Sequence, residues 1–313
     1  MRIIHHPKHK SLKGCVVALG TFDGVHRGHQ KVIKEAIACA KKLKTVCLAI
    51  TFDPHPQQII VPERGLKLLT DVKEREALLS GLGVDGVVVM KFSQHLRGLS
   101  ADRFVRRYLV NRLGACQVFV GFDFAFGQSR GGDVASLKHL GQKYGFQVNV
   151  IPAVKAGPHP IKSSNIRKLI SQGDFAQALK LLGHPYQLSG RVVRGVGRGR
   201  ELGFPTANLA VSPHKLIPAH GVYAGFMGKK KCAVNIGGRP TFGAGQTLVE
   251  VHLLDFHGSL RGKRLNVCLT KRLREERQFS DVEKLRQQIK LDIKKVKALS
   301  DLTRCVIMTK SWY

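Results

Sequence analysis

The chain has 313 residues, a length that favours two domains over one large domain. Apolar residues make up 43% of the sequence, so real hydrophobic cores are possible and wholesale disorder is excluded. No apolar run approaches the roughly 18 residues of a membrane-spanning helix, and the basic N-terminal stretch lacks the apolar core of a secretory signal. We therefore expect a cytoplasmic protein with no membrane partner.

The net charge is +31 at pH 7, from 52 Lys and Arg against 21 Asp and Glu. A surface of this kind attracts polyanions. The basic residues are nevertheless spread over the whole chain, and the densest runs, at 41–44, 229–231 and 294–297, contain no aromatic residues that could stack on bases. Anionic small substrates are therefore favoured over a dedicated nucleic-acid partner.

Seven cysteines are scattered along the chain without a Cys-x-x-Cys pair. An odd number of isolated cysteines gives almost no support to a disulfide framework or a zinc site. The cysteine pattern favours a reducing compartment, in agreement with a cytoplasmic location.

The first 183 residues alternate apolar strands with amphipathic helices. Strands without polar alternation predict a parallel sheet with both faces covered, and ligands bind such sheets beyond the carboxyl ends of the strands. We expect strands at 15–20, 45–52, 86–92, 117–121 and 146–151, and helices at 28–43, 71–82, from Ser100 or Asp102 to 112, and 134–144.

The pattern changes near His184, where short strands broken by Gly and Pro begin. Closely spaced strands of this kind predict a small antiparallel barrel, followed by one helix that Ser280 or Asp281 caps. We therefore predict two domains, 1–183 and 184–313. The barrel strands are expected at 188–194, 222–227, 231–236, 247–256 and 265–273, and the helix is expected to end near 297.

The segment 19–29 leaves a strand and opens a helix, whose unpaired N–H groups and dipole suit a phosphate. Gly20 and Gly28 let the backbone turn sharply and approach a ligand closely. His26 and His29 can donate to a triphosphate and stabilise the charge that develops as pyrophosphate leaves. The other interpretation is a tight turn with two surface histidines.

Two further segments of this half have a functional and a structural interpretation. Ser163 or Ser164 can cap the helix that follows, and Arg167 can reach a phosphate; taken alone, this segment is a simple helix cap. The glycine-rich stretch 120–133 contains three aromatic residues. It either holds a planar ring or forms the aromatic edge of a core.

In the second half, the oxygens of Thr206 and Asn208 can face one Mg²⁺, a cation that takes few protein ligands and fills its shell with phosphates and water. The alternative is a turn followed by a strand. Glu250 interrupts an apolar strand; it either faces solvent or is the base that phosphoryl transfer to an alcohol requires. The glycines at 195–199 do not form a dinucleotide fingerprint because no helix is expected after them.

The motifs GTFDGVHRGHQ, TFDPHP, VGFDFAFGQSRGGDV and SSNIR, in this order and spacing, resemble the FMN adenylyltransferase module of bacterial bifunctional riboflavin kinase/FAD synthetases. That module is a Rossmann-like member of the HxGH nucleotidylyltransferases. The resemblance implies that Asp123 and Phe124 lie near the flavin or adenine. Lys162 and Ala125 depart from the residues common in the family. The ATP or phosphate positions implied are Gly20, Phe22, His26, Gly28, His29, Ser163, Ser164 and Arg167, with the two histidines catalytic.

The motifs GRELGFPTANL, IPAHGVYAG, NIGGRPTF, VEVHLLDF and LREERQFSDVEKLRQQIKLDI resemble the riboflavin kinase barrel and its closing helix. By this resemblance Thr206 and Asn208 bind Mg·ATP, with Gly203 beside the ATP. Glu250 is then the catalytic base. Arg274 and Phe279 lie in the segment that closes over the flavin.

The two resemblances cover nearly the whole chain and imply a bifunctional α/β enzyme. The barrel would phosphorylate riboflavin with Mg·ATP to FMN, and the N-terminal domain would adenylylate FMN with a second ATP to FAD and pyrophosphate. Two other classes remain: a nucleotidylyltransferase for another acceptor whose barrel only binds flavin, and an RNA-binding or regulatory protein with the enzyme fold. A binder needs neither Glu250 nor Thr206, which argues against the former.

Overall fold

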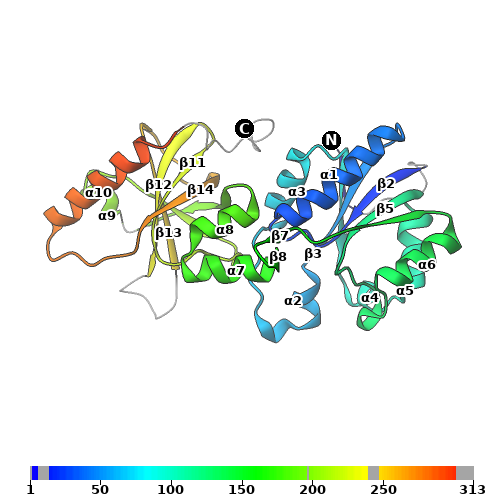
Figure 1. Ribbon diagram of the computed structural model, residues 1–313. Helices are drawn as coiled ribbons and strands as arrows, with labels where there is room; N and C mark the ends of the chain where they lie inside the picture. The colour runs from blue at the N-terminus through cyan, green and yellow to red at the C-terminus, as the bar shows by residue number, and fades with distance from the viewer. Residues whose placement is uncertain (1, 6–13, 196, 239–246, 301–313) are drawn as a thin grey trace. The chain divides into compact units, whose positions relative to one another are not determined.

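The structure is a computed structural model that describes residues 2–5, 14–195, 197–238 and 247–300 (Figure 1). By their contacts the residues form two compact units. The first consists of Met1–Leu66 and Val72–Lys162, and the second of Lys67–Asp71 and Ser163–Tyr313.

The first unit is built on a six-stranded sheet in the order β1-β4-β3-β2-β5-β6, in which every neighbouring pair is parallel. The predicted parallel sheet is thus confirmed, with β1 as an additional edge strand that the sequence analysis did not identify. The strands are β1 (Arg2–His5), β2 (Cys15–Leu19), β3 (Cys47–Asp53), β4 (Gly86–Lys91), β5 (Ala115–Gly121) and β6 (Gln147–Ile151).

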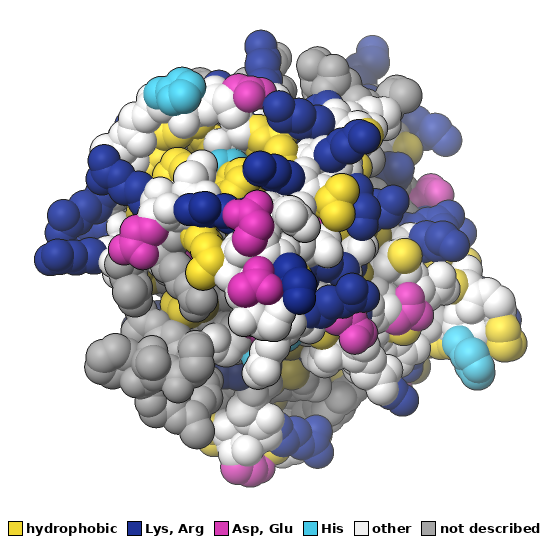
Figure 2. Space-filling view, turned by 90° about the vertical axis from the view of Figure 1, so that its left-hand side faces the viewer, with side chains coloured by type: hydrophobic (Ala, Val, Ile, Leu, Met, Phe, Trp, Pro, Cys, Tyr) yellow, Lys and Arg dark blue, Asp and Glu magenta, His cyan; other side chains and the backbone are white. Residues whose placement is uncertain are grey.

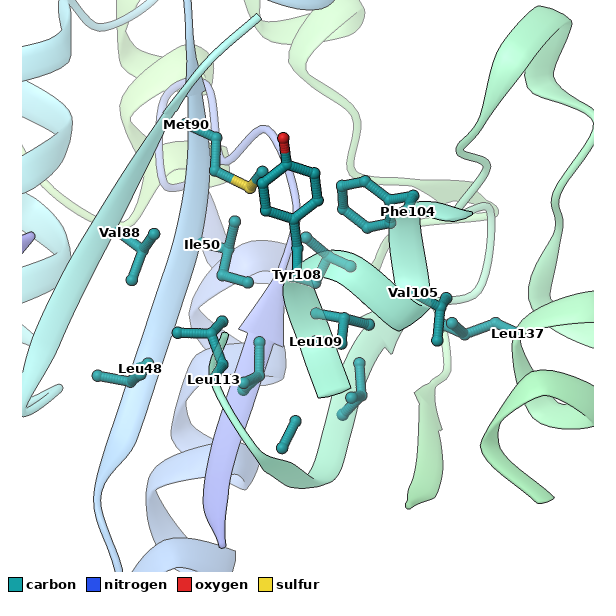
Figure 3. Close-up of a cluster of buried hydrophobic side chains, with 14 of the residues drawn as sticks. Leu48, Ile50, Val88, Met90, Phe104, Val105, Tyr108, Leu109, Leu113 and Leu137 are labelled. Carbon is teal, nitrogen blue, oxygen red and sulfur yellow. The ribbon is translucent and has the colours of Figure 1, made fainter. Parts of the chain in front are cut away.

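Helices cover both faces of this sheet, as its fully apolar strands require (Figure 1). On one face lie α1 (Arg27–Lys42) and α3 (Val72–Gly81). On the other face, buried side chains from β2, β3, β4 and β5 pack against α4 (Gln94–Arg97), α5 (Ala101–Phe104) and α6 (Val134–Tyr144). Figure 3 shows this second cluster, in which Ile50 and Val88 of the sheet face Tyr108, Leu109 and Leu137.

The predicted helix that ends at 112 differs from the observed one. Ser100 accepts from the Arg103 backbone N–H and so caps α5, as expected, but the helix continues as a π-helical segment over Val105–Val110. The wider winding keeps Tyr108, Leu109 and Leu113 on the core side (Figure 3). Apolar spacing gives no warning of such a change of pitch.

The shorter elements of the first unit were not anticipated, because each is too brief to show a periodic pattern. These short elements lie in the connections between the strands and the longer helices. They are α2 (Pro56–Ile60), the 3₁₀ turns η1 (Pro62–Arg64) and η3 (Gln128–Arg130), and the ribbon of β7 (Lys155–Ala156) with β8 (His159–Pro160).

The second unit contains a closed antiparallel barrel in the order β10-β13-β12-β11-β14-β9, with β9 and β10 paired to close it. The predicted barrel is confirmed. The segment that contains Asn208, for which the sequence also allowed a turn followed by a strand, forms strand β10. A two-residue turn at Gly228 and Lys229 joins β11 to β12. The strands are β9 (Tyr186–Val193), β10 (Ala207–Val211), β11 (Gly221–Met227), β12 (Lys230–Gly238), β13 (Thr247–Leu253) and β14 (Arg264–Arg274).

Helices also belong to the barrel unit. Asp281 accepts from the Lys284 backbone N–H and caps α10 (Val282–Lys297), which packs against β11 and β12. The helices α7 (Ser163–Gln172) and α8 (Phe175–Leu182) also belong to this unit, and the ring of Phe175 lies 5.1 Å from that of Tyr223 in the barrel.

The segment 67–71 is joined to the barrel unit by backbone hydrogen bonds. Leu68 donates to the His214 carbonyl at 2.7 Å and accepts from the Leu216 N–H at 2.8 Å. The ammonium group of Lys215 donates to the Leu69 carbonyl and lies 4.3 Å from the Tyr186 ring. These five residues therefore complete one side of the second unit although they lie far away in the sequence.

Five of the described cysteines are free: Cys15, Cys39, Cys47, Cys116 and Cys232. Cys268 is disulfide-bonded, which scattered cysteines gave no reason to expect. Burial raises the pKa of the Cys232 thiol to about 12, so this side chain remains a neutral core residue. None of the helices in the described ranges is both long and apolar enough to cross a bilayer.

Candidate active sites

The first candidate site lies where β2 ends and α1 begins. His26 is the N-cap of α1, and its Nδ1 accepts from the His29 backbone N–H at 3.3 Å. A neutral His26 ring that accepts at Nδ1 carries its proton on Nε2, which is then a hydrogen-bond donor. The helix thus presents its positive end and an imidazole donor at the same place.

The rings of His26 and His29 are stacked, with centroids 3.6 Å apart. Phe22, which is 2% exposed, packs edge to face against His29. The two predicted histidines therefore lie in contact, and the Phe22 ring packs against His29. Since His26 is only 5% exposed, the interpretation as two surface histidines does not fit its burial.

Two of the predicted glycines are required by close approach. A Cβ at Gly28 would lie 3.1 Å from the His26 ring, and a Cβ at Gly20 would lie 2.9 Å from the Phe22 ring. A side chain at either position would push an aromatic ring of the site out of place. The absence of a side chain at Gly20 and Gly28 therefore leaves room for the Phe22 and His26 rings.

The stretch after β5 contains an aromatic core edge and, beside it, a group of exposed side chains. Phe124 stacks on Phe126 at 5.4 Å, and both pack against the core, so they form an aromatic core edge. Asp123 is exposed, and its carboxylate lies 3.7 Å from the ammonium group of Lys162. The same ammonium group lies 5.7 Å from the ring of Phe122, which is 42% exposed. An exposed ring, an acid and a base thus lie together at this strand exit.

Ser163, Ser164 and Arg167 lie on α7, in the second compact unit. The helix begins at Ser163, so both serines lie within its first turn and not before it, as a cap would. Arg167 follows one turn later and is half-buried. Their association with the histidines of the first unit stays a prediction.

Arg75 on α3 lies beside the candidate site, and the sequence analysis did not single it out. Its side chain is fully buried, and its Nη1 donates to the carbonyls of Thr21 and Phe52, at 3.0 and 2.9 Å, and to the Thr51 hydroxyl at 2.8 Å. It therefore ties the segment before His26 to the end of β3. A sequence signal existed: Arg75 lies three and four residues before two core leucines, on the apolar face of its helix.

The second candidate site lies on the outer face of the barrel. Glu250 on β13 pairs in register with Asn208 on β10 and with Asn235 on β12. The amide of Asn235 donates to the Glu250 carboxylate at 3.3 Å. Because the alternate residues Val249 and Val251 fill the barrel interior, the three polar side chains share the opposite face.

Gly195, before α9 (Arg198–Glu201), and Gly199, within it, lie close to Asn208 and Thr206 respectively. A Cβ at Gly199 would lie 2.8 Å from the Thr206 hydroxyl oxygen, and a Cβ at Gly195 would collide with the Asn208 amide. The sequence analysis expected no helix after these glycines; the single turn α9 begins at Arg198 and contains the third of them, Gly199. Gly203 adopts a φ of +87°, which a side chain would strain.

Arg274 and Phe279 are brought together after β14. The Arg274 guanidinium lies 5.7 Å from the Phe279 ring and donates to the carboxylate of Asp292 on α10 at 2.9 Å. Asp292 is only 3% exposed and also accepts from Gln288 at 3.0 Å. This buried pair fixes the segment that precedes α10 on the barrel.

The donor set of the second site fits a hard cation. Asn208 is 8% exposed, and its amide lies beside a carboxylate in register, with the Thr206 hydroxyl two residues away. Hydroxyl, amide and carboxylate oxygens are the ligands that Mg²⁺ takes, in small number, beside phosphate and water. No group of three or more His, Cys, Asp or Glu side chains in the described part of the chain is arranged to hold a metal by itself.

Two family models match the chain in succession: FAD synthetase over residues 8–165 and riboflavin kinase over residues 182–300. The chain is 39% identical over 299 residues to a bifunctional riboflavin kinase/FMN adenylyltransferase of Pseudomonas fluorescens, covering 94% of each chain. It is 35% identical to the protein of that name from Escherichia coli K12, covering 93% of this chain and 95% of the relative.

A crystal structure described as a macrolide-efflux protein from Streptococcus pneumoniae has the same fold, with a TM-score of 0.84 and 29% sequence identity. The similarity covers 95% of this chain and 99% of that one. The two matched models follow the order of the parallel sheet and the barrel along the sequence. The chain belongs to the bifunctional riboflavin kinase/FMN adenylyltransferase family.

Proposed function

We propose that this protein phosphorylates riboflavin with ATP to give FMN and ADP, and then transfers AMP from a second ATP to FMN to give FAD and pyrophosphate. The observation that carries the proposal is that each matched region contains its own polar constellation. These are the His26–His29 pair at the start of α1 and the Asn208–Glu250–Asn235 row on the barrel.

In the kinase step, Glu250 acts as the general base. Its carboxylate takes the proton of the ribityl 5′-hydroxyl while that oxygen attacks the γ-phosphorus of ATP and the bond to ADP breaks. The hydrogen bond from Asn235 holds one carboxylate oxygen, which leaves the other for the substrate. Arg274 and Phe279 position the flavin from the segment that closes the site.

Thr206 and Asn208 would hold the Mg²⁺ that accompanies ATP, and Gly203 would lie beside the nucleotide. When bound, the ion neutralises charge on the transferred phosphoryl group. The chain's own part is to present these oxygens in a fixed place, and the close contacts of Gly195 and Gly199 with them support that role.

In the adenylyl step, a phosphate oxygen of FMN attacks the α-phosphorus of ATP, and the bond to pyrophosphate breaks. The Nε2 donor of His26, the ring of His29 and the N-terminal N–H groups of α1 stabilise the charge on the leaving group. We assign Ser163, Ser164 and Arg167 to the same phosphates. Asp123 and Phe124 lie on the flavin or adenine side, where exposed Phe122 and Lys162 offer a ring and a cation.

Incubation of the full chain with riboflavin, ATP and Mg²⁺, followed by chromatography of the flavins, tests both steps together. FMN should appear first and FAD later, and chelation of Mg²⁺ should stop the formation of FMN. A second incubation with FMN in place of riboflavin isolates the adenylyl step. Formation of neither FMN nor FAD in these reactions would refute the proposal.

A further inference from the structure

The lysine run 229–231 has no part in the proposed reactions. In the structure it forms the β11–β12 turn and the start of β12, beside the C-terminal end of α10. A hollow of about 300 Å³ opens there, lined by Lys229, Lys230, Lys231, Leu254, Asp255 and Lys297. Figure 2 shows the side of the barrel unit on which Lys and Arg outnumber Asp and Glu.

Two of these ammonium groups are held in place by backbone carbonyls. Lys230 donates to the Asp255 carbonyl at 2.9 Å. Lys231 donates to the carbonyls of Lys297 and Leu299, at 2.7 and 2.8 Å. An ammonium group has three N–H donors, so Lys230 keeps two for another acceptor and Lys231 keeps one. Part of the entropy cost of ordering a cationic site is therefore already met in the free protein.

The hollow has an excess of positive charge. Four lysines share it with one carboxylate, Asp255. Within the described residues, none of the four ammonium groups forms an ion pair, and the side chains of Lys229 and Lys297 are exposed. An excess of cations around a concave surface attracts an anion with more than one charge.

The hollow is separate from the candidate kinase site. Lys230 precedes Asn235 on β12 by five residues, which corresponds to about 17 Å along a strand. Glu250 and Asn208 lie in register with Asn235, away from the turn at Gly228 and Lys229.

We propose that this hollow is a binding site for a small oligophosphate anion, distinct from the sites where ATP reacts. Lysine ammonium groups bind phosphate oxygens as point charges, and several of them around one hollow match the several charges of a di- or triphosphate. The buried side chain of Leu254 lines the hollow together with these cations.

The probe is inorganic triphosphate, and the first measurement is amine acetylation of the full chain, read residue by residue by mass spectrometry. Saturating triphosphate should slow acetylation of Lys229 and Lys297 about tenfold or more, and leave that of exposed Lys138 on α6 unchanged. Sulfate at equal ionic strength is the control for general screening. Equal protection by sulfate, or no protection of Lys229 and Lys297, would overturn the proposal.

The second measurement is calorimetric titration of the double variant Lys229→Gln/Lys297→Gln with triphosphate. Neither side chain makes a hydrogen bond within the described residues, so the fold should persist. The variant should lose one binding event that the wild type has, or bind there about tenfold weaker for each lysine removed. Lys138→Gln/Lys180→Gln removes the same charge elsewhere and should bind as the wild type. An unchanged titration of the first variant would overturn the proposal, whatever its flavin activities.

Discussion

Single side chains decide the chemistry at both candidate sites, and neighbouring residues decide how those side chains are held. Glu250 would be an ordinary exposed carboxylate if the strands on either side carried apolar residues. Asn208 and Asn235 make it part of a polar row. His29 likewise depends on Phe22 and His26 for its orientation.

Glu250→Gln should lower the rate of riboflavin phosphorylation by about 10²–10⁴-fold, the usual contribution of a general base. The amide keeps the shape of the side chain but cannot take the hydroxyl proton. FAD formation from supplied FMN should be unchanged, because that step uses the other site. Glu283→Gln, an exposed carboxylate in the first turn of α10, is the control. A wild-type rate of FMN formation by the Glu250 variant would remove the base assignment.

His29→Ala should lower the rate of FAD formation by about 10²–10³-fold, the loss expected for one preorganised donor at a developing charge. Supplied with riboflavin alone, the variant should accumulate FMN, and His26→Ala should behave in the same way. The measurement is the ratio of FMN to FAD over time, with exposed His139→Ala as the control. Normal FAD production by both variants would leave this motif a structural turn.

Arg75→Met should lower kcat for FAD formation tenfold or more, because displacement of a reacting group by about 1 Å can cost 10²-fold. The three acceptors of Arg75 would lose their donor, so the melting temperature should also fall. Arg75→Lys keeps the positive charge that Arg75→Met removes, but an ammonium group does not have the planar shape of the guanidinium. This variant should therefore recover only part of kcat. If both variants have a lower melting temperature but an unchanged kcat for FAD formation, Arg75 stabilises the fold and does not position the site. The kinase step is the internal control.

At the scale of elements, sequence patterns predict what is long and periodic. The apolar runs identified five of the six strands of the sheet to within about two residues, and missed β1. The spacing of Val282, Leu285, Ile289 and Ile293 identified α10. The motifs around His26 and Glu250 could be placed for the same reason, because each interrupts or follows such a run.

What the sequence did not reveal depends on contacts between distant residues. The π-helical pitch at 105–110 follows from packing against the sheet, and the role of Arg75 follows from carbonyls that only the folded β2 and β3 bring together. The close approach of Gly199 to Thr206 likewise leaves no periodic pattern in the sequence that would predict it. These features are set by tertiary structure, which local propensity does not report.

Gly199→Ala tests the element that covers the kinase site. Its Cβ would lie 2.7 Å from the Phe204 carbonyl and 2.8 Å from the Thr206 hydroxyl, so either α9 or the segment 204–206 must move. We expect riboflavin phosphorylation to fall about tenfold or more, with FAD formation from FMN retained. Gly98→Ala, where the nearest atom is 3.5 Å away, is the matched control. Normal FMN formation by Gly199→Ala would show that this close packing does not matter.

At the scale of the whole molecule, the chain alternates between its two compact units. It enters the barrel unit for 67–71, returns to the sheet, and enters the barrel unit again at Ser163. We keep the proposal that riboflavin kinase activity resides in residues 184–313. The contacts of Phe175 and Leu69 show which parts outside that range stabilise the same unit.

A fragment of residues 184–313 should therefore make FMN but no FAD, and should melt at a lower temperature than a fragment of residues 163–313. The shorter fragment exposes Tyr223 and Tyr186, which Phe175 covers in the full chain. Loss of a buried aromatic side chain costs about 3–5 kcal/mol. The measurement is flavin chromatography beside thermal melting of both fragments. Activity in 163–313 together with inertness of 184–313 would move the functional boundary towards Ser163.

Because residues 67–71 belong to the barrel unit, they affect whether the two units can be encoded as separate proteins. A gene divided between residues 71 and 215 would leave this segment with the upstream product, together with the carbonyl that accepts from Lys215. The downstream product would then contain a lysine that is 4% exposed and no longer has that acceptor. A barrel produced without this segment is therefore expected to be less stable than the same barrel in the full chain.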